Sequence, residues 1–193
     1  MVRLGIISDT HGLLRAEAAA FLQGCDRIVH GGDIGNTEVL MRLSTIAPVT
    51  AVRGNNDKGA WAEAIPETAC FEFGGISVYA IHDLSLLDVD PSAAGVQVVV
   101  SGHSHKPAIE RRNDIVFVNP GSAGPRRFKL PISVAEILVE GSVISSRIVE
   151  LEIDRAVSRG APGATNLKVR GAGAPCNRPE LPAGVSPPRF LPR

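Results

Sequence analysis

Four of the chain's five histidines occur in short polar motifs that also contain aspartates, asparagines and glycines. In chain order the motifs are Asp9-x-His11, Gly31-Gly32-Asp33, Gly54-Asn55-Asn56-Asp57, His82 and Gly102-His103-Ser104-His105. Imidazole nitrogens and carboxylate or amide oxygens suit borderline divalent cations, so Mn²⁺, Fe²⁺, Ni²⁺ or Zn²⁺ is favoured over Ca²⁺. The three cysteines form no C-x-x-C motif, which argues against a thiolate zinc site and a disulfide framework. The motifs therefore predict a divalent-metal site without cysteine ligands.

Each motif follows a short apolar run that is typical of a buried β-strand. These runs are residues 3–8, 27–30, 49–52, 77–81 and 96–101. Between the first three runs, apolar residues recur at helical spacing within residues 14–22 and 36–46, as in βαβ units. Ligand sites in α/β sheets form at the carboxyl ends of strands, where residues far apart in sequence can meet. We therefore expect the motifs to line one cleft.

The pattern becomes richer in strands after Thr68. Further strands are expected at residues 69–73, 109–111 and 115–118, followed by a hairpin of residues 132–139 and 143–153 around Glu140-Gly141. An α/β half followed by a β-rich half predicts two sheets packed face to face, with helices outside. About 150 residues can bury a single core without disulfides.

Charge is distributed unevenly along the chain. Residues 1–152 hold 13 basic and 18 acidic side chains, whereas residues 153–193 hold 7 basic and 2 acidic ones. The acidic body argues against a broad nucleic-acid-binding face but is compatible with a small phosphate-containing substrate. We predict one folded domain over residues 1–153 and a flexible basic tail, rich in proline, glycine and arginine, over residues 154–193.

The sequence also predicts a cytoplasmic protein without membrane contact. The first apolar run meets Asp9 and His11 too early to form a signal peptide. The longest stretch without Asp, Glu, Lys or Arg is residues 91–105, which is shorter than the ~20 apolar residues of a membrane span.

The ordered motifs resemble those of the calcineurin-like metallophosphoesterases. Within that superfamily the compact length and three segments are similar to the small YfcE-type phosphodiesterases: Ile7-Ser8-Asp9-Thr10-His11-Gly12, Val52-Arg53-Gly54-Asn55 and Asn119-Pro120-Gly121-Ser122. The resemblance covers residues 2–152. It implies a four-layer αββα sandwich of two mixed β-sheets flanked by helices, a pair of divalent metals at the sheet edge, and hydrolysis of phosphoester bonds.

The resemblance also implies ligand roles for seven residues. The first ion would be held by Asp9, His11, Asp33 and His105, and the second by Asp33, Asn55, His82 and His103. Mn²⁺ is the expected ion, with Fe, Ni, Co or Zn as alternatives. Two such ions can generate a hydroxide near neutral pH and clamp the phosphorus oxygens.

The catalytic candidates beside the ligands are Asn55, Asp57 and Arg53. Asn55, with Arg53 or Arg126, would oppose charge on the phosphoryl oxygens in the transition state. Asp57 is interpreted as an orienting carboxylate. Arg127 is a further candidate for binding phosphate.

Two positions depart from the family pattern. Many members have a histidine that can serve as general acid where this chain has Asn56, so protonation of the leaving group lacks its usual residue. In the family a glycine usually follows the ligand histidine, whereas this chain has Asp83 at that position. Asp83 could narrow the site or accept a hydrogen bond from a ligand.

Some nearby residues have structural interpretations. His30 is expected to be a hydrogen-bonded loop residue or a support for a ligand. The Asn119-Pro120-Gly121-Ser122 segment is expected to be a turn beneath the site. Trp61 and Ile65 could form a cleft wall, pack in the core or make a dimer contact.

These observations favour a phosphodiesterase that acts on a small phosphoester. One alternative is a non-catalytic protein-binding scaffold, since the same fold serves as a subunit of the eukaryotic retromer. Another is a nuclease, which the acidic body disfavours. A homo-oligomer is compatible with the sequence, and cyclic nucleotides, small diesters and monoesters all remain open as substrates.

Overall fold

The computed structural model describes residues 1–153. The predicted basic tail lies outside the described residues. Among the described residues, no helix is long and apolar enough to cross a membrane.

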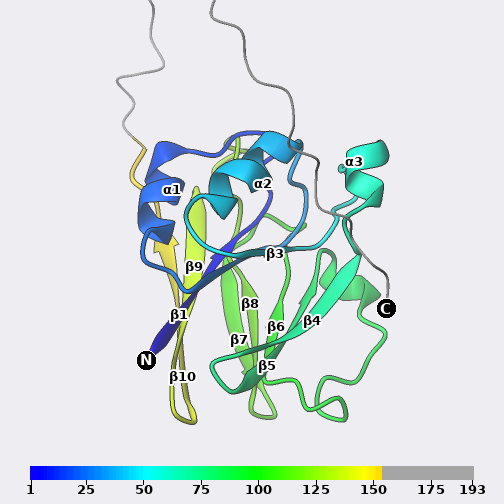
Figure 1. The fold of residues 1–193 in the computed structure, drawn as a ribbon, viewed down its shortest axis with the longest axis vertical. Coiled ribbons are helices and arrows are strands. Elements are labelled where there is room, and N and C mark those ends of the chain that lie inside the picture. Colours follow the sequence, from blue (N-terminus) through cyan, green and yellow to red (C-terminus); the bar gives the residue numbers. More distant parts are fainter. Residues whose placement is uncertain (154–193) are drawn as a thin grey trace, which may run out of the picture. The chain divides into compact units, whose positions relative to one another are not determined.

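The first sheet carries the amino-terminal motifs. Its strand order is β10-β9-β1-β2-β3 (Figure 1). The strands are β1 (Val2–Ile7), β2 (Arg27–His30), β3 (Val49–Ala51), β9 (Ser133–Glu140) and β10 (Val143–Glu150). Since β1, β2 and β3 are mutually parallel, their carboxyl ends lie at one edge. β9 returns antiparallel to β1 and forms the predicted hairpin with β10.

The second sheet carries the carboxyl-terminal motifs. Its order is β4-β5-β6-β8-β7. The strands are β4 (Thr68–Phe73), β5 (Ile76–Ile81), β6 (Val98–Val100), β7 (Ala108–Arg112) and β8 (Ile115–Asn119). The three central strands β5, β6 and β8 are parallel, whereas β4 and β7 are antiparallel edges. Both sheets are therefore mixed, as the sequence predicts.

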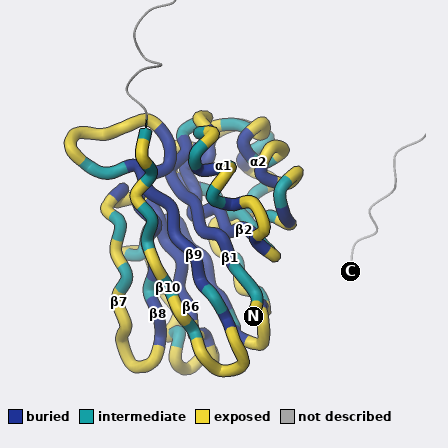
Figure 2. The backbone as a smooth tube through the Cα atoms, turned by 90° about the vertical axis from the view of Figure 1, so that its left-hand side faces the viewer, coloured by how far each residue is buried: buried dark blue, intermediate teal, exposed yellow. Residues whose placement is uncertain are grey.

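The main core lies between the sheets. Alternate residues of each strand point into it because side chains alternate across a strand. Leu4 and Ile6 of β1 meet Val78 and Val98 of the second sheet, and all four are fully buried. Burial of side chains of this size stabilises the fold by about 1.5–3 kcal/mol each. Figure 2 shows buried residues along β1 and β9 and exposed residues at the hairpin turns.

Helices cover the outer face of the first sheet. These are α1 (Ala16–Leu22) and α2 (Thr37–Ser44), which pack Leu22 and Leu43 into a second apolar cluster. The side chain of Asn36 accepts a hydrogen bond from Val39 N, so it caps α2 as its position predicts. Trp61 of the one-turn helix α3 (Ala60–Glu63) and Ile65, which follows it, are partly buried against this cluster. Both side chains therefore contribute to core packing, and the dimer contact stays a prediction from the sequence.

The outer face of the second sheet has a thinner cover. Tyr79 and Val99 pack there against Leu84, which begins the 3₁₀ turn η1 (Leu84–Leu86), and Leu87, which follows it. Within residues 1–153, no α-helix longer than one turn follows β3. The fourth layer of the sandwich is consequently formed by this turn and its loop.

A charged cluster lies within the first sheet, on β1, β9 and β10. The Glu136 carboxylate is almost completely buried and accepts hydrogen bonds from Arg3 Nε and Arg147 Nε, each at 2.5 Å. Arg3 also donates to the carbonyl oxygens of Phe21 and Gln23, at 2.8 and 2.9 Å, which ties the end of α1 to the sheet. Burial alone would raise the pKa of Glu136, but the hydrogen bonds from both arginines outweigh it and lower the pKa. Every charge in this cluster therefore has a partner.

Candidate metal centre

The predicted motifs meet at one edge of the sandwich. The loops after β1, β2 and β3 come from the first sheet, and those after β5 and β6 from the second. The two groups of loops are joined directly, because His103 N donates to Asp9 Oδ2 at 3.2 Å and His82 Nδ1 donates to Gly31 O at 2.7 Å. Parallel strands thus bring residues almost a hundred positions apart into contact.

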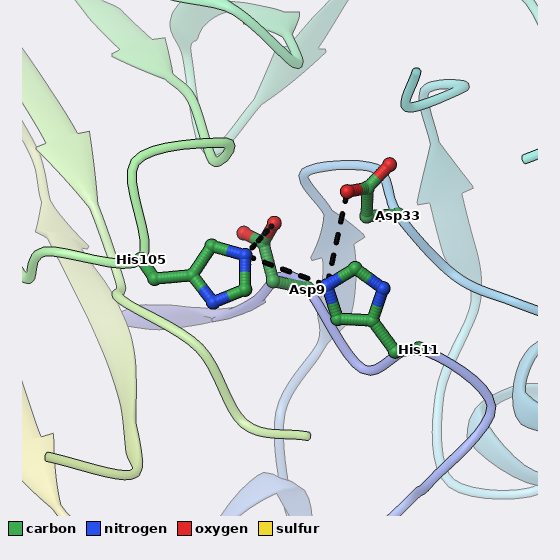
Figure 3. Close-up of side chains that lie close together, drawn as sticks. All are labelled: Asp9, His11, Asp33 and His105. Carbon is green, nitrogen blue, oxygen red and sulfur yellow. Dashed lines mark hydrogen bonds and ion pairs between the residues drawn. The ribbon is translucent and has the colours of Figure 1, made fainter. Parts of the chain in front are cut away.

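One group contains two aspartates and two histidines: Asp9, His11, Asp33 and His105 (Figure 3). One potential ligand atom of each residue lies within 4.8 Å of the others. His105 Nε2 is 3.1 Å from Asp9 Oδ1 and 3.4 Å from His11 Nε2. His11 Nε2 is in turn 3.8 Å from Asp33 Oδ2. This set matches the first ligand group implied by the sequence.

A second group lies on the other side of Asp33. Asn55 Oδ1 is 3.1 Å from His82 Nε2 and 3.0 Å from His103 Nδ1. His82 Nε2 is also 3.5 Å from Asp33 Oδ1. The two oxygens of Asp33 therefore face one histidine of each group. All seven sequence-predicted ligands come together, and Asp33 lies between the two halves.

The donor atoms fit divalent cations. Asp9 Oδ1 is buried and has no hydrogen-bond donor, although His105 Nε2 lies near it. Because Gly31 O can only accept, the proton of a neutral His82 ring is on Nδ1, and Nε2 presents a lone pair to Asn55 and Asp33. Facing acceptors of this kind need a positive charge between them, and imidazole, carboxylate and amide donors are ligands for borderline metals.

Several ligands have an unusual backbone conformation. Eight non-glycine residues of the described chain have positive φ, and five of them are predicted ligands: Asp9, His11, Asp33, His103 and His105, with φ between 46° and 66°. This left-handed region costs a non-glycine residue free energy and occurs often at functional sites. The backbone is strained in the loops that converge on the proposed ions.

The loop after β3 positions Asp33. A Cβ atom on Gly54 would lie 2.1 Å from Asp33 N, so only glycine permits this approach. Asn56 donates to both oxygens of Asp33, from its backbone N at 2.8 Å and from Nδ2 at 2.6 Å. Asp57 accepts from Gly54 N and Gly35 N, each at 2.8 Å, and so joins two loops. The sequence alone did not predict that Asn56 anchors Asp33. The available signal was its position next to the predicted ligand Asn55.

His30 supports the site from below. Its ring is fully buried, Nδ1 accepts from Gly32 N at 3.2 Å, and Nε2 lies 2.9 Å from the hydroxyl of Thr10. Since Thr10 donates that hydroxyl proton to Ile34 O, His30 Nε2 is the donor to Thr10. Burial lowers the pKa of His30 to about 4. His30 is therefore a neutral connector between two ligand loops, as the sequence predicts.

The turn after β8 supports the remaining histidines. Asn119 Nδ2 donates to Gly102 O at 2.6 Å, and its Oδ1 accepts from Gly121 N at 2.9 Å. Ser122 donates to Asp9 O at 2.9 Å. The Asn119-Pro120-Gly121-Ser122 segment thus connects the ligand loops of both sheets.

The surroundings of the first group favour a neutral His11 and a charged Asp9. Burial lowers the pKa of His11, and Arg127 lowers it further against the opposing effect of Asp33. Burial alone would raise the pKa of Asp9, but its contacts with His105 and Ser8 lower it below the usual value. These are the protonation states in which both groups can bind a cation.

A cavity of about 440 Å³ adjoins the second group. Its wall includes Asn55, His82 and His103 together with the acidic residues Asp57, Glu67, Asp83 and Asp88. Arg53 also lines the cavity, and its Nη2 donates to Glu67 at 2.5 Å. Asp83 Oδ2 lies 3.7 Å from His103 Nε2. Arg53, which the sequence predicts to contact phosphate, is therefore paired with the Glu67 carboxylate on the cavity wall.

Two further arginines, Arg126 and Arg127, are exposed in the loop between β8 and β9. Arg127 Nη2 is 3.5 Å from His11 Nε2. Arg126 instead donates to Leu130 O at 3.3 Å. Arg127 is thus the arginine of this pair that reaches a predicted ligand.

Comparison with known proteins gives consistent matches. Residues 2–142 match the family described as "Calcineurin-like phosphoesterase superfamily domain". A "Probable metallophosphoesterase" of Methanothermobacter thermautotrophicus is 32% identical over 179 residues, which span 86% of this chain and 98% of that relative. A phosphodiesterase of Methanocaldococcus jannaschii is 26% identical over 138 residues, which span 62% of this chain and 83% of that relative. The crystal structure of Chaetomium thermophilum Vps29 has a similar fold, with a TM-score of 0.69, 19% identity, and coverage of 81% of this chain and 92% of that one.

Proposed function

This chain belongs to the calcineurin-like phosphoesterase superfamily, and we propose that it is a phosphodiesterase whose site holds two divalent ions. The position of Asp33 carries the proposal. Its Oδ2 faces His11 and its Oδ1 faces His82, so one carboxylate can serve two adjacent ions. Asn56 donates to both oxygens and fixes the carboxylate plane, and each oxygen keeps a lone pair for a metal.

The ligand charges suit this assignment. Asp9 and Asp33 contribute negative charge, and the four histidines and Asn55 contribute neutral donors. Two divalent ions would activate a water molecule for attack on phosphorus and stabilise negative charge on the phosphoryl oxygens. Mn²⁺ is the proposed ion, because the ligand set combines imidazole nitrogens with carboxylate and amide oxygens and lacks thiolate. The chain's own task is to hold seven donors in place through strained loops and buried hydrogen bonds.

The cavity beside the second group accommodates the rest of the substrate. Its volume is suited to a small ester group. Acidic side chains outnumber basic ones on its wall, and Arg53 is paired with Glu67. A polyphosphate in this cavity would be repelled. The proposed substrate is therefore a small phosphodiester with a neutral or weakly charged ester group.

The test is hydrolysis by metal-loaded protein. Full-length protein is freed of metal with a chelator, loaded with Mn²⁺, and assayed with bis(p-nitrophenyl) phosphate and with p-nitrophenyl phosphate. We expect turnover of both to depend on Mn²⁺ and kcat/KM to be higher for the diester. Asp33→Asn serves as the inactive control, because it keeps the side-chain shape and removes the shared charge.

The alternatives give different results in the same assay. A protein-binding scaffold would bind Mn²⁺ and hydrolyse neither ester. A nuclease would cleave single- or double-stranded DNA faster than the small diester, which the acidic body of the chain disfavours. A cytoplasmic location and a homo-oligomer stay predictions from the sequence.

A further inference from the structure

Arg127 lies in the loop between β8 and β9, on the exposed rim of the metal centre. Its guanidinium Nη2 is 3.5 Å from Nε2 of His11. His11 Nε2 itself lies 3.4 Å from His105 Nε2 and 3.8 Å from Asp33 Oδ2. Arg127 thus contacts the atom of His11 that faces the other ligands of the first group.

A guanidinium has donors but no acceptor and stays charged at any ordinary pH. The contact with Arg127 therefore requires a lone pair on His11 Nε2. A metal ion held by the first group needs that same lone pair. Arg127 and the ion cannot both use it, so metal binding deprives Arg127 of its acceptor.

Metal binding would also place a fixed positive charge beside Arg127. Like charges at this separation repel unless an anion lies between them. A phosphodiester has two non-bridging oxygens, which can face the ions and the guanidinium at the same time. Arg127 is exposed and has several rotatable side-chain bonds, so it can follow an oxygen without movement of the core.

We propose that Arg127, whose guanidinium lies against His11, is a substrate-binding residue that binds a non-bridging phosphate oxygen when the ligands hold their ions. The inference rests on the proposed function for the identity of the anion. It differs from the assignment of Arg53, which Glu67 already holds on the cavity wall.

The experiment compares Arg127→Gln with Arg126→Gln. Arg126 is a matched control, because it is the exposed neighbour and donates to Leu130 O instead of a ligand, so the proposed site leaves out the phosphate-binding role that the sequence suggested for it. The first measurement is Mn²⁺ affinity of full-length protein by calorimetry in buffer without phosphate. Removal of the competing guanidinium should tighten Mn²⁺ binding to Arg127→Gln about 3- to 10-fold, since a modest contact is lost.

The second measurement is the affinity of the Mn²⁺-saturated protein for inorganic phosphate. Arg127→Gln should bind phosphate about 10- to 100-fold more weakly, as expected for loss of a charge-assisted hydrogen bond. Arg127→Lys should recover part of the loss, and Arg126→Gln should match the wild type in both measurements. The thermal unfolding midpoint should be the same in all variants, because both arginines are exposed.

The two proposals can fail separately. If the Mn²⁺-loaded wild type hydrolyses no ester but Arg127→Gln still binds Mn²⁺ more tightly and phosphate more weakly, the enzymatic proposal fails and the assignment of Arg127 stands. Unchanged phosphate affinity in Arg127→Gln would overturn the assignment whatever happens to Mn²⁺. An equal loss in Arg126→Gln would also overturn it, because the effect would then come from general surface charge.

Discussion

Two buried carboxylates in this protein have opposite surroundings. Glu136 receives hydrogen bonds from two arginines, one on each oxygen, within regular strands. Asp9 lies in a loop at positive φ, and its Oδ1 has no hydrogen-bond donor. Burial opposes charge on both groups, yet both pKa values are lowered, that of Glu136 by its two arginines and that of Asp9 by His105 and by the Ser8 hydroxyl on its other oxygen, Oδ2.

Glu136 is therefore an example of a buried charge that stabilises the fold, whereas Asp9 is an example of one that a bound cation would stabilise. A buried carboxylate with hydrogen-bond donors on both oxygens stabilises the folded state, and its removal leaves those donors unpaired. An unsatisfied one destabilises the folded state unless a cation binds. The loop edge and the Arg3–Glu136–Arg147 cluster should therefore respond to mutation in opposite ways.

The largest expected effect is at the loop edge. Asp33→Asn should lower kcat/KM for a small diester by more than about 10³-fold, because the charge shared by the two ligand groups is lost. Elemental analysis after desalting should find both ions lost or one loosely held. The metal-free variant should unfold about 0.5–1.5 kcal/mol more easily than the metal-free wild type, because the amide nitrogen cannot accept one of the two hydrogen bonds from Asn56.

An opposite pattern would break the comparison. Full occupancy by two ions in Asp33→Asn would remove the bridging role of this residue. A large loss of stability without metal would mean that Asp33 belongs with Glu136 among the structural charges.

The second effect concerns the leaving group. Every histidine at the edge is assigned as a ligand in the proposed site, and both nitrogens of His30 are engaged below the site. The pKa of Asp83 is lowered, first of all by the backbone hydrogen bond from Ser85, so this carboxyl is not a proton donor near neutral pH. General acid catalysis typically increases the rate about 10²–10⁴-fold. Because no such acid is present among the described residues, alkyl diesters should be hydrolysed more slowly than aryl diesters by at least that factor.

The measurement is the slope of log kcat against leaving-group pKa for a series of methyl aryl phosphates. Mn²⁺ must be saturating, and the chemical step must be shown to limit the rate. A steep negative slope is expected. A flat slope would identify a proton donor that the described residues do not reveal.

The third effect is at the satisfied cluster. Glu136→Gln should lower the free energy of unfolding by about 1–3 kcal/mol, since two hydrogen bonds between charged groups are weakened and both arginines still reach solvent. Metal content and kcat should match the wild type at a temperature where both proteins are folded. Glu110→Gln is the control, because its partner Arg112 and Glu110 itself are exposed, and such pairs contribute at most about 1 kcal/mol.

The smallest effect is the pH dependence of the difference in unfolding free energy between the wild type and Glu136→Gln. The folded-state pKa of Glu136 is below its ordinary value of 4.5. Its contribution to stability is therefore complete above the unfolded-state pKa and is lost as the pH falls through the folded-state pKa. Urea unfolding of wild type and Glu136→Gln should differ most at neutral pH and converge below about pH 4. A difference in unfolding free energy that does not change with pH would show that the glutamate acts through packing alone.

Much of the fold and site was predictable because both depend on local patterns. Apolar runs marked the strands, and polar motifs after them marked the ligands, since parallel strands end at a common edge. The helix α3 was missed because a single turn, Ala60–Glu63, shows no apolar periodicity. The thin fourth layer was also missed, because a 3₁₀ turn can replace a helix without a distinct sequence signal.

Side-chain direction was harder to predict than position. Asn56 was expected to leave the site without its usual acid, and its amide also donates to Asp33, a contact that the sequence did not indicate. Arg53 was expected to contact phosphate, which stays a prediction, and its guanidinium is paired with Glu67, fourteen positions further along the chain. Both outcomes depend on contacts between loops from different strands, which no local pattern contains.

The central claim is that Asp33 lies between two ions. A crystal of Mn²⁺-loaded protein, measured at the manganese absorption edge, locates the ions directly. We predict two anomalous peaks about 3.5–4 Å apart, one on each side of the Asp33 carboxylate. One should lie among Asp9, His11 and His105, and the other among Asn55, His82 and His103. A single peak, or two peaks that do not share Asp33, would contradict the claim.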